Sequence, residues 1–213
     1  RVENVVAVKK IHIGNSDYPY VSGQAWRRWW REVLYADFNW KPSEVTREAK
    51  SAYTKGDPIA YEEDDLFGYM AARKRERRRR SAEEEEEETA EIVAGTNRRI
   101  SPLKNSLLIS VLPIVITKDF GHFSRNLPPD TDIIPFESEH YTTYLQGVFT
   151  ISLADVGRFT LGEMEDLSKD ILDAHKGELQ RDTNNERVYW LNKDLRIRRV
   201  QDAVKALARL RGG

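Results

Sequence analysis

The sequence contains no cysteine among its 213 residues, which excludes disulfide bonds and thiolate-bound metal sites within it. It has no apolar run close to the roughly 18–20 residues that cross a bilayer. The amino end has no pattern typical of a secretory signal peptide. From these absences we expect a cytoplasmic protein that has no membrane partner and needs no cofactor.

Several motifs of common enzymes are also missing. There is no glycine-rich phosphate loop of the Walker type and no Gly-x-Ser-x-Gly elbow. The histidines lack the i, i+4 spacing of zinc ligands; they are His12, His122, His140 and His175. Carboxylates gather at residues 62–65, but consecutive side chains on a helix do not point together, so Asp64 and Asp65 are interpreted as partners of a helix amino terminus. We therefore expect no catalytic residues, no metal site and a protein that is not an enzyme.

The charge balance hides strong local clusters. The formal net charge of −1 argues against a polyanionic partner, but nucleic-acid binding depends on local patches rather than on the average. Basic residues fill positions 73–80, and a block of six acids follows at Glu83 to Glu88. Such a low-complexity run is typical of a solvated helix or an inserted segment.

The order of the predicted elements favours an α+β fold. Strands are predicted at residues 5–13, 107–117 (a buried strand) and 141–153. Helices are predicted at 24–35 and 195–210, the second with an apolar face of Ile197, Val200, Val204 and Leu207. Without insertions, this order resembles the βαββαβ sandwich of ferredoxin-like and RNA-recognition-motif (RRM-like) domains, lacking the last strand. Because that strand is missing and residue 1 is not methionine, we expect the sequence to be truncated.

The helix near the amino end carries the most informative pattern. Four long polar side chains recur at i, i+3, i+4 and i+7 and so share one face: Gln24, Arg27, Arg28 and Arg31. Ser22 is placed as the N-cap, and Gly23 leaves room for a ligand at the positive end of the helix dipole. Because arginine binds phosphate bidentately, this face predicts a phosphate site. The alternative is an ordinary surface helix whose arginines pair with acids. The three tryptophans of the helix are interpreted as core residues rather than as groups that stack on bases.

Two further segments carry candidate contacts. A loop at 97–104 precedes a strand and offers cations for a backbone phosphate, namely Arg98, Arg99 and Lys104; the alternative is a solvated loop. A long excursion at 118–141 holds aromatic and basic side chains that could stack on bases: Phe120, His122, Phe123, Arg125, His140 and Tyr141. The alternative is a lid that packs on its own domain, although loops of this length are often functional.

Five short motifs occur in an order that points to one family. They are residues 19–28 (PYVSGQAWRR), 64–69 (DDLFGY), 99–103 (RISPL), 147–149 (GVF) and 156–159 (VGRF). In this order they resemble the DevR branch of the CRISPR-associated Cas-seven backbone family, of type I-B. The resemblance is spread over residues 5–213.

The resemblance implies an RRM-like palm with a helical finger insertion and a β-hairpin thumb. The palm would comprise residues 1–38, 97–117 and 141–213, the finger 39–96 and the thumb 118–140. RNA-backbone contacts would fall at Ser22, Gln24, Arg27 and Arg28, with Arg98 and Arg99 near the strand that borders the guide. Gly212 and Gly213 would begin a glycine-rich loop that contacts RNA. By this resemblance, we expect the first and last strands of the family to be missing from this sequence.

The resemblance also implies a role in antiviral defence. The chain would bind CRISPR guide RNA (crRNA) as a backbone subunit of a type I Cascade surveillance complex, with further copies of itself in a helical filament and with other Cascade subunits. It would present the guide for pairing with target DNA. Two alternatives stay open: a Mg²⁺-dependent subunit that cleaves target RNA through Asp119, Asp130 or Asp132, and a generic RNA-binding module.

Overall fold

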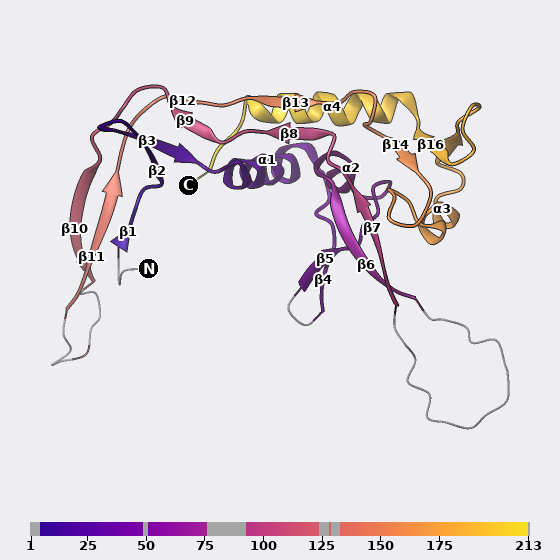
Figure 1. Cartoon of the computed structure of the whole chain (residues 1–213), viewed down its shortest axis with the longest axis horizontal. Coiled ribbons are helices and arrows are strands. Elements are labelled where there is room, and N and C mark those ends of the chain that lie inside the picture. The colour runs from indigo at the N-terminus through magenta and orange to yellow at the C-terminus, as the bar shows by residue number, and fades with distance from the viewer. Residues whose placement is uncertain (1–4, 49–50, 76–92, 124–127, 129–132, 213) are drawn as a thin grey trace. The chain divides into compact units, whose positions relative to one another are not determined.

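The structure, a computed structural model, describes residues 5–48, 51–75, 93–123, 128 and 133–212. The chain divides into two compact units. Figure 1 labels the helices and strands of both. Unit 1 comprises Arg1–Arg28 and Asn105–Phe149, and unit 2 comprises Trp29–Lys104 and Thr150–Gly213. Helix α1 (Gly23–Phe38) begins in unit 1 and ends in unit 2. Helices and strands are mixed in the described residues, which confirms the expected α+β class.

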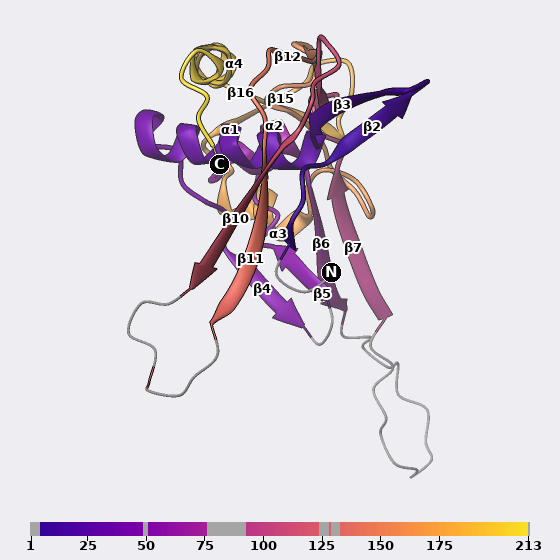
Figure 2. The ribbon, with the colours of Figure 1, turned by 90° about the vertical axis from the view of Figure 1, so that its left-hand side faces the viewer.

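Unit 1 contains two small sheets. One has the antiparallel order β12-β9-β3-β2, built from β2 (Lys10–Ile13), β3 (Ser16–Val21), β9 (Leu108–Ser110) and β12 (Leu145–Gln146). The other has the order β1-β11-β10, built from β1 (Val5–Val6), β10 (Thr117–Phe123) and β11 (Ile134–His140). Strands β10 and β11 lie side by side as an antiparallel pair, with Thr117 opposite His140 (Figure 2). The β-hairpin expected at 118–140 is therefore present.

Three strand predictions are wrong in their extent. Residues 5–13 divide between two sheets, because β1 pairs in parallel with β11 whereas β2 pairs with β3. In the segment 107–117, only Leu108–Ser110 and the final Thr117 belong to strands. Val111 is 52% exposed and Val115 is 91% exposed, so this apolar run is not a buried strand. The segment 141–153 contains two short strands, β12 and β13 (Phe149–Ile151), rather than one.

Unit 2 contains most of the helices and several two- and three-stranded sheets. The hairpins are β4–β5 (Val45–Glu48, Ser51–Thr54) and β6–β7 (Tyr69–Arg75, Val93–Arg99). A further sheet has the order β14-β16-β15, from Arg158–Thr160, Val188–Leu191 and Leu179–Arg181, and β8 (Leu103–Asn105) pairs with β13. The remaining helices are α2 (Glu62–Phe67), α3 (Lys169–Ala174) and α4 (Lys193–Leu207). The described strands thus fall into six sheets, and the RRM-like arrangement stays a prediction.

The expected helical finger at 39–96 is wrong for most of its described residues. Its helix is confined to α2, which ends at Gly68, where φ is 73° and a left-handed backbone stops the helix. In the strand that follows, Tyr69 and Ala71 are buried while Met70 is 59% exposed. This alternation has the period of a strand, not of a helix. The acidic block Glu83 to Glu88 lies outside the described residues.

Two long helices meet in the core of unit 2. Trp30 of α1 is fully buried, and its Nε1 donates a hydrogen bond of 2.8 Å to the carbonyl oxygen of Ala203 in α4. Helix α4 buries Arg199, Ala203 and Ala206, whereas Ile197 is 44% exposed and Val204 is 48% exposed. The predicted helix is confirmed, but of its predicted apolar face only Val200 and Leu207 are half-buried, and the most buried residues lie beside them. Small alanine side chains allow the close helix approach that the large Trp30 ring requires.

Other core residues follow the predicted pattern more closely. Trp26, in unit 1, is 3% exposed, so it and Trp30 confirm the interpretation of these tryptophans as core. A second apolar cluster in unit 2 joins strands and helix α3 through Ile59, Phe159, Leu167, Ile171 and Leu191. Each such buried side chain contributes roughly 1.5–3 kcal/mol. Within the described residues, no helix combines the length and apolar character needed to cross a bilayer.

Candidate functional site

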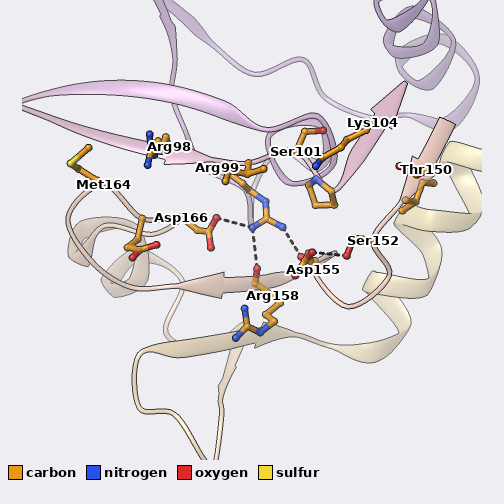
Figure 3. A pocket seen from close by; sticks show the side chains of 14 residues that line it. Arg98, Arg99, Ser101, Lys104, Thr150, Ser152, Asp155, Arg158, Met164 and Asp166 are labelled. Carbon is orange, nitrogen blue, oxygen red and sulfur yellow. Dashed lines mark hydrogen bonds and ion pairs between the residues drawn. The ribbon is translucent and has the colours of Figure 1, made fainter. Parts of the chain in front are cut away.

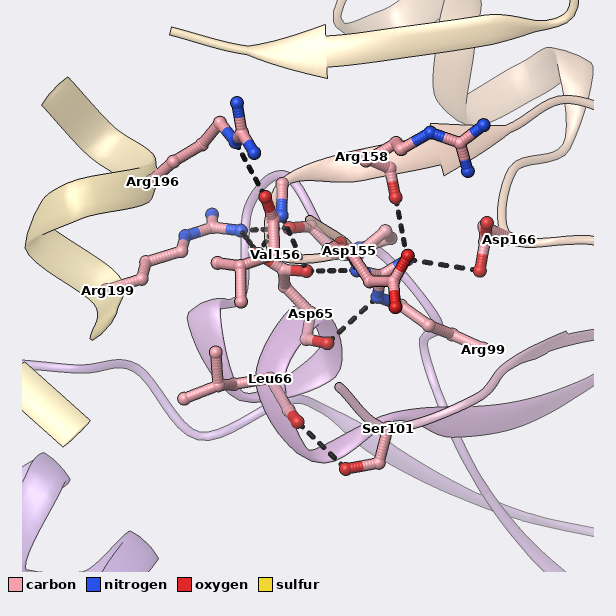
Figure 4. Close-up of polar contacts among 12 residues, drawn as sticks. Asp65, Leu66, Arg99, Ser101, Asp155, Val156, Arg158, Asp166, Arg196 and Arg199 are labelled. Carbon is pink, nitrogen blue, oxygen red and sulfur yellow. Dashed lines mark hydrogen bonds and ion pairs between the residues drawn. The ribbon is translucent and has the colours of Figure 1, made fainter. Parts of the chain in front are cut away.

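The carboxylate of Asp65 is the centre of a buried ion cluster in unit 2 (Figure 4). Arg199 Nη1 of α4 donates to Asp65 Oδ2 at 2.6 Å, and Arg99 Nη2 of β7 donates to Asp65 Oδ1. The backbone N–H of Gly157 lies 3.0 and 3.1 Å from the two oxygens. We call Asp65, Arg99, Gly157 and Arg199 the Asp65 cluster. It joins three of the sequence motifs, 64–69, 99–103 and 156–159, and adds α4 to them.

Arg99 was predicted to bind RNA, and the structure contradicts this prediction. Its side chain is 2% exposed and forms a second ion pair with Asp166 at 3.1 Å. Three backbone carbonyl oxygens accept its remaining N–H groups, at Asp65 (2.8 Å), Arg158 (3.0 Å) and Asp155 (2.7 Å). A guanidinium whose donors all point inward has none left for a phosphate. Arg99 is therefore a structural residue.

The acids at 62–65 do not converge on one point. They occupy the first turn of α2, as expected for partners of the helix dipole, although the N-cap is Tyr61 and has no side-chain cap. Asp64 Oδ2 accepts hydrogen bonds from Ser43 Oγ (2.9 Å) and from the Asp57 N–H (3.0 Å). Burial raises the pKa of Asp64 to about 6, against the opposing effect of these two donors. Among the described residues, no group of three or more histidines and acids could hold a metal ion.

The start of α1, in unit 1, is built against residues 105–106. Ser22 Oγ accepts a hydrogen bond of 3.3 Å from the Ala25 N–H, as predicted for an N-cap. A Cβ at Gly23 would lie 3.1 Å from the Ser106 carbonyl oxygen and 3.3 Å from Asn105 Nδ2. Glycine thus allows the close approach of the chain's own backbone here, while the ligand contact at Gly23 stays a prediction.

The polar face of α1 divides into two parts. Gln24 and Arg28 are exposed, and half-buried Arg27 donates through Nη1 to Asn105 Oδ1 at 2.9 Å. Arg31, in contrast, lies 3.4 Å from a carboxylate oxygen of Glu63 and 4.7 Å above the Phe67 ring. Arg31 thus forms an ion pair within unit 2, and its contact with a phosphate stays a prediction.

Unit 2 also contains a hollow of about 700 Å³ (Figure 3). Its lining residues belong to β7, β8, β13 and β14 and to the loops that follow β7, β13 and β14. Two exposed cations predicted from the sequence, Arg98 and Lys104, line it. A third lining cation, Arg158, was not predicted as a site residue. The sequence does carry an indication of it, because apolar Phe159 lies between polar Arg158 and Thr160, an alternation that places these two on the opposite face of a strand. In the structure Phe159 is fully buried.

The hairpin β10–β11 in unit 1 presents some of the predicted aromatic contacts. Phe120 is 75% exposed and His122 is exposed, while Tyr141 is half-buried. The His140 ring is exposed, and its Nε2 lies 2.9 Å from Ser138 Oγ. Phe123 belongs to β10, and Arg125 lies outside the described residues, as do Asp130 and Asp132. Of the three aspartates of the cleavage alternative, only Asp119 is therefore described.

Comparison with known proteins assigns the chain to a family. A family model described as "CRISPR-associated negative auto-regulator DevR/Csa2" matches residues 1–213. No curated protein matches the chain. The matched range includes all five motifs, three of which meet in the Asp65 cluster. The chain therefore belongs to the DevR/Csa2 family of CRISPR-associated proteins.

Proposed function

We propose that this protein binds CRISPR guide RNA as a backbone subunit of a type I, I-B-like Cascade complex, and that it is not itself an enzyme. The observation that carries the proposal is the polar surface at the start of α1. Gln24 and Arg28 are exposed there, and Arg27 is fixed by its hydrogen bond to Asn105. Family membership in a CRISPR-associated group supplies the biological context.

The proposed action on RNA is physical rather than chemical. Guanidinium groups of Arg27 and Arg28 neutralise backbone phosphates without reading the base sequence. Exposed aromatic side chains such as Phe120, on the β10–β11 hairpin, offer surfaces on which unpaired bases can stack. The guide then pairs with target DNA, and base pairing supplies the specificity.

Repetition along the guide follows from this mode of binding. A contact that ignores sequence can be made by successive copies of the chain, and head-to-tail contacts produce an open helical filament. The palm that carries these contacts is proposed to be RRM-like. Other Cascade subunits would bind to the filament ends or along it.

The direct test is purification of the protein from its native complex without nuclease treatment. We expect co-purified RNA of uniform length with CRISPR repeat sequence at its ends. The same preparation treated with ribonuclease provides the control, because its ultraviolet absorbance at 260 nm should fall to that of protein alone. A protein that carries no RNA, or RNA of random length and sequence, would contradict the proposal.

A further inference from the structure

Three cations that line the hollow in unit 2 form no ion pair among the described residues, although Arg158 interacts electrostatically with Asp182, which is not a lining residue. Arg98, Lys104 and Arg158 each have no carboxylate oxygen within 4.0 Å of their charged nitrogens. The guanidinium of Arg158 lies 5.6 Å from the centre of the Trp190 ring, which holds it without neutralising it. Three cations that line one hollow and form no ion pair give it a positive potential, which favours an anionic ligand (Figure 3).

The acids in the same wall are engaged elsewhere. Asp166 binds Arg99 Nη1 at 3.1 Å and accepts the Thr160 N–H at 2.9 Å. Asp155 accepts the hydroxyl of Ser152, and Glu165 lies 3.9 Å from Arg187, which is not a lining residue. The carboxylates of the wall therefore leave the three cations available.

The hollow also has exposed apolar side chains. Ile100 is 74% exposed and Met164 is 59% exposed, and both line it. Met164 has a φ of 62°, a left-handed conformation that costs free energy for any residue with a side chain. A long side chain kept exposed in this conformation does nothing for the core, which points to a contact with a ligand.

We infer that this hollow binds one unpaired nucleotide of a single-stranded RNA. The phosphate lies among Arg98, Lys104 and Arg158, and the face of the base lies against Ile100 and Met164. In a duplex the base faces are stacked and unavailable, so single-stranded RNA fits this combination of charge and apolar surface. The volume of about 700 Å³ is within the range of pockets for small ligands. The inference rests on the proposed function and adds to it a contact of unit 2 separate from the arginines of α1.

The test is photocrosslinking of the full chain to single-stranded RNA that contains 4-thiouridine, with crosslinked peptides identified by mass spectrometry. We expect crosslinks at residues 100–104 or 158–166. Double-stranded RNA of the same sequence should give none there. Single-stranded DNA containing 4-thiothymidine tests whether the hollow prefers RNA to DNA. Equal crosslinking by this DNA at the same residues would overturn the assignment to RNA.

Two variants separate a binding role from a structural one. Arg98→Gln with Arg158→Gln should reduce crosslinking at these residues by about a hundredfold, because each of the two charge-assisted contacts is worth about a factor of ten. Arg198→Gln removes a comparably exposed charge outside the hollow and should leave crosslinking unchanged. Met164→Gly should reduce crosslinking while the Tm stays the same or rises, since glycine accepts positive φ.

The outcomes distinguish this site from the proposed function. RNA binding by the unmodified chain, with crosslinks that map elsewhere or do not change in these variants, would overturn the nucleotide site alone. Failure of the unmodified chain to bind single-stranded RNA would overturn the proposed function and the site with it. A fall in Tm for Met164→Gly would show that Met164 stabilises the fold and would remove it from the site.

Discussion

At the scale of single residues, side chains of one type have opposite roles in this protein. Arg99 and Arg199 are buried at 5% exposure each and fix the position of Asp65, while Arg28 and Arg98 are exposed. A buried ion pair with satisfied hydrogen bonds holds segments together, but removal of one partner leaves an uncompensated charge. Burial and partners therefore decide which arginines can meet a ligand.

Asp65→Asn should strongly destabilise the fold. Asparagine has the same shape, but it leaves the buried charge of Arg199 without its counterion and Arg99 with Asp166 alone, at a cost of about 3–5 kcal/mol in the free energy of unfolding. Urea denaturation followed by circular dichroism measures this loss. Asp119→Asn, at an exposed position on β10, is the matched control and should change stability by less than about 0.5 kcal/mol. Equal stability of the two variants would contradict the role of the cluster.

Arg27→Ala with Arg28→Ala should weaken guide binding equally for all spacer sequences. Two lost phosphate contacts should make the slope of log K against log salt shallower by about 1.4, from about 0.7 per contact on single strands. Filter binding across a salt series measures the slope. Arg198→Ala should preserve it, and an unchanged slope in the double variant would count against phosphate contacts by α1.

Asp64 should make stability depend on pH. Its pKa is raised by burial to about 6, so the folded state holds its proton more tightly than the unfolded chain. The free energy of unfolding should therefore fall as pH rises from about 4 to 6. Asp64→Asn keeps a neutral acceptor for Ser43 and should be more stable than the unmodified protein by about 2 kcal/mol at pH 8, but not at pH 4. Thermal unfolding at both pH values tests this, and an equal difference at both would contradict it.

A second titrating group acts at higher pH. Burial would lower the pKa of His175, but hydrogen bonds to Glu178 and Asp57 raise it above its usual value. Its stabilising effect is complete below about pH 6.5 and is lost as pH rises through the raised pKa. This part of the pH profile should therefore persist in Asp64→Asn, which makes the two contributions separable.

At the scale of elements, helices with strong periodicity could be predicted, while their packing faces could not. Helices α1 and α4 are present within a few residues of the predicted bounds, and the β10–β11 hairpin is where the excursion was expected. The buried face of α4 was missed because it contains Arg199, whose partner Asp65 is 134 residues away in sequence. The strand β6 was missed because basic residues gave no alternating apolar pattern.

The contact between α1 and α4 provides a prediction at this scale. Ala203 is fully buried beneath Trp30, so Ala203→Leu should overpack the interface and cost about 1–3 kcal/mol. Val204→Leu, on the 48% exposed neighbouring position, should be tolerated within about 0.5 kcal/mol. Tm values from calorimetry compare the two. Equal effects would show that the helices do not pack through Ala203.

At the scale of the whole molecule, a net charge of −1 conceals cationic surfaces in both units. Arg27 and Arg28 belong to unit 1, while Arg98, Lys104 and Arg158 belong to unit 2. The motifs in the sequence identified the family but only part of the candidate site, because motif residues such as Arg99 serve the fold. Exposure and ion pairing, which decide the rest, depend on contacts between distant segments that a single sequence does not display.

The Asp65 cluster has a consequence for how such proteins diverge. Its members cannot be exchanged one at a time, because the loss of one side chain leaves a buried charge without a counterion or an N–H group without an acceptor. Surface cations such as Lys104 carry no such constraint and can be replaced at little cost to stability. Descendants of this chain could therefore change the surface proposed to bind RNA while keeping the short motifs by which their ancestry is recognised.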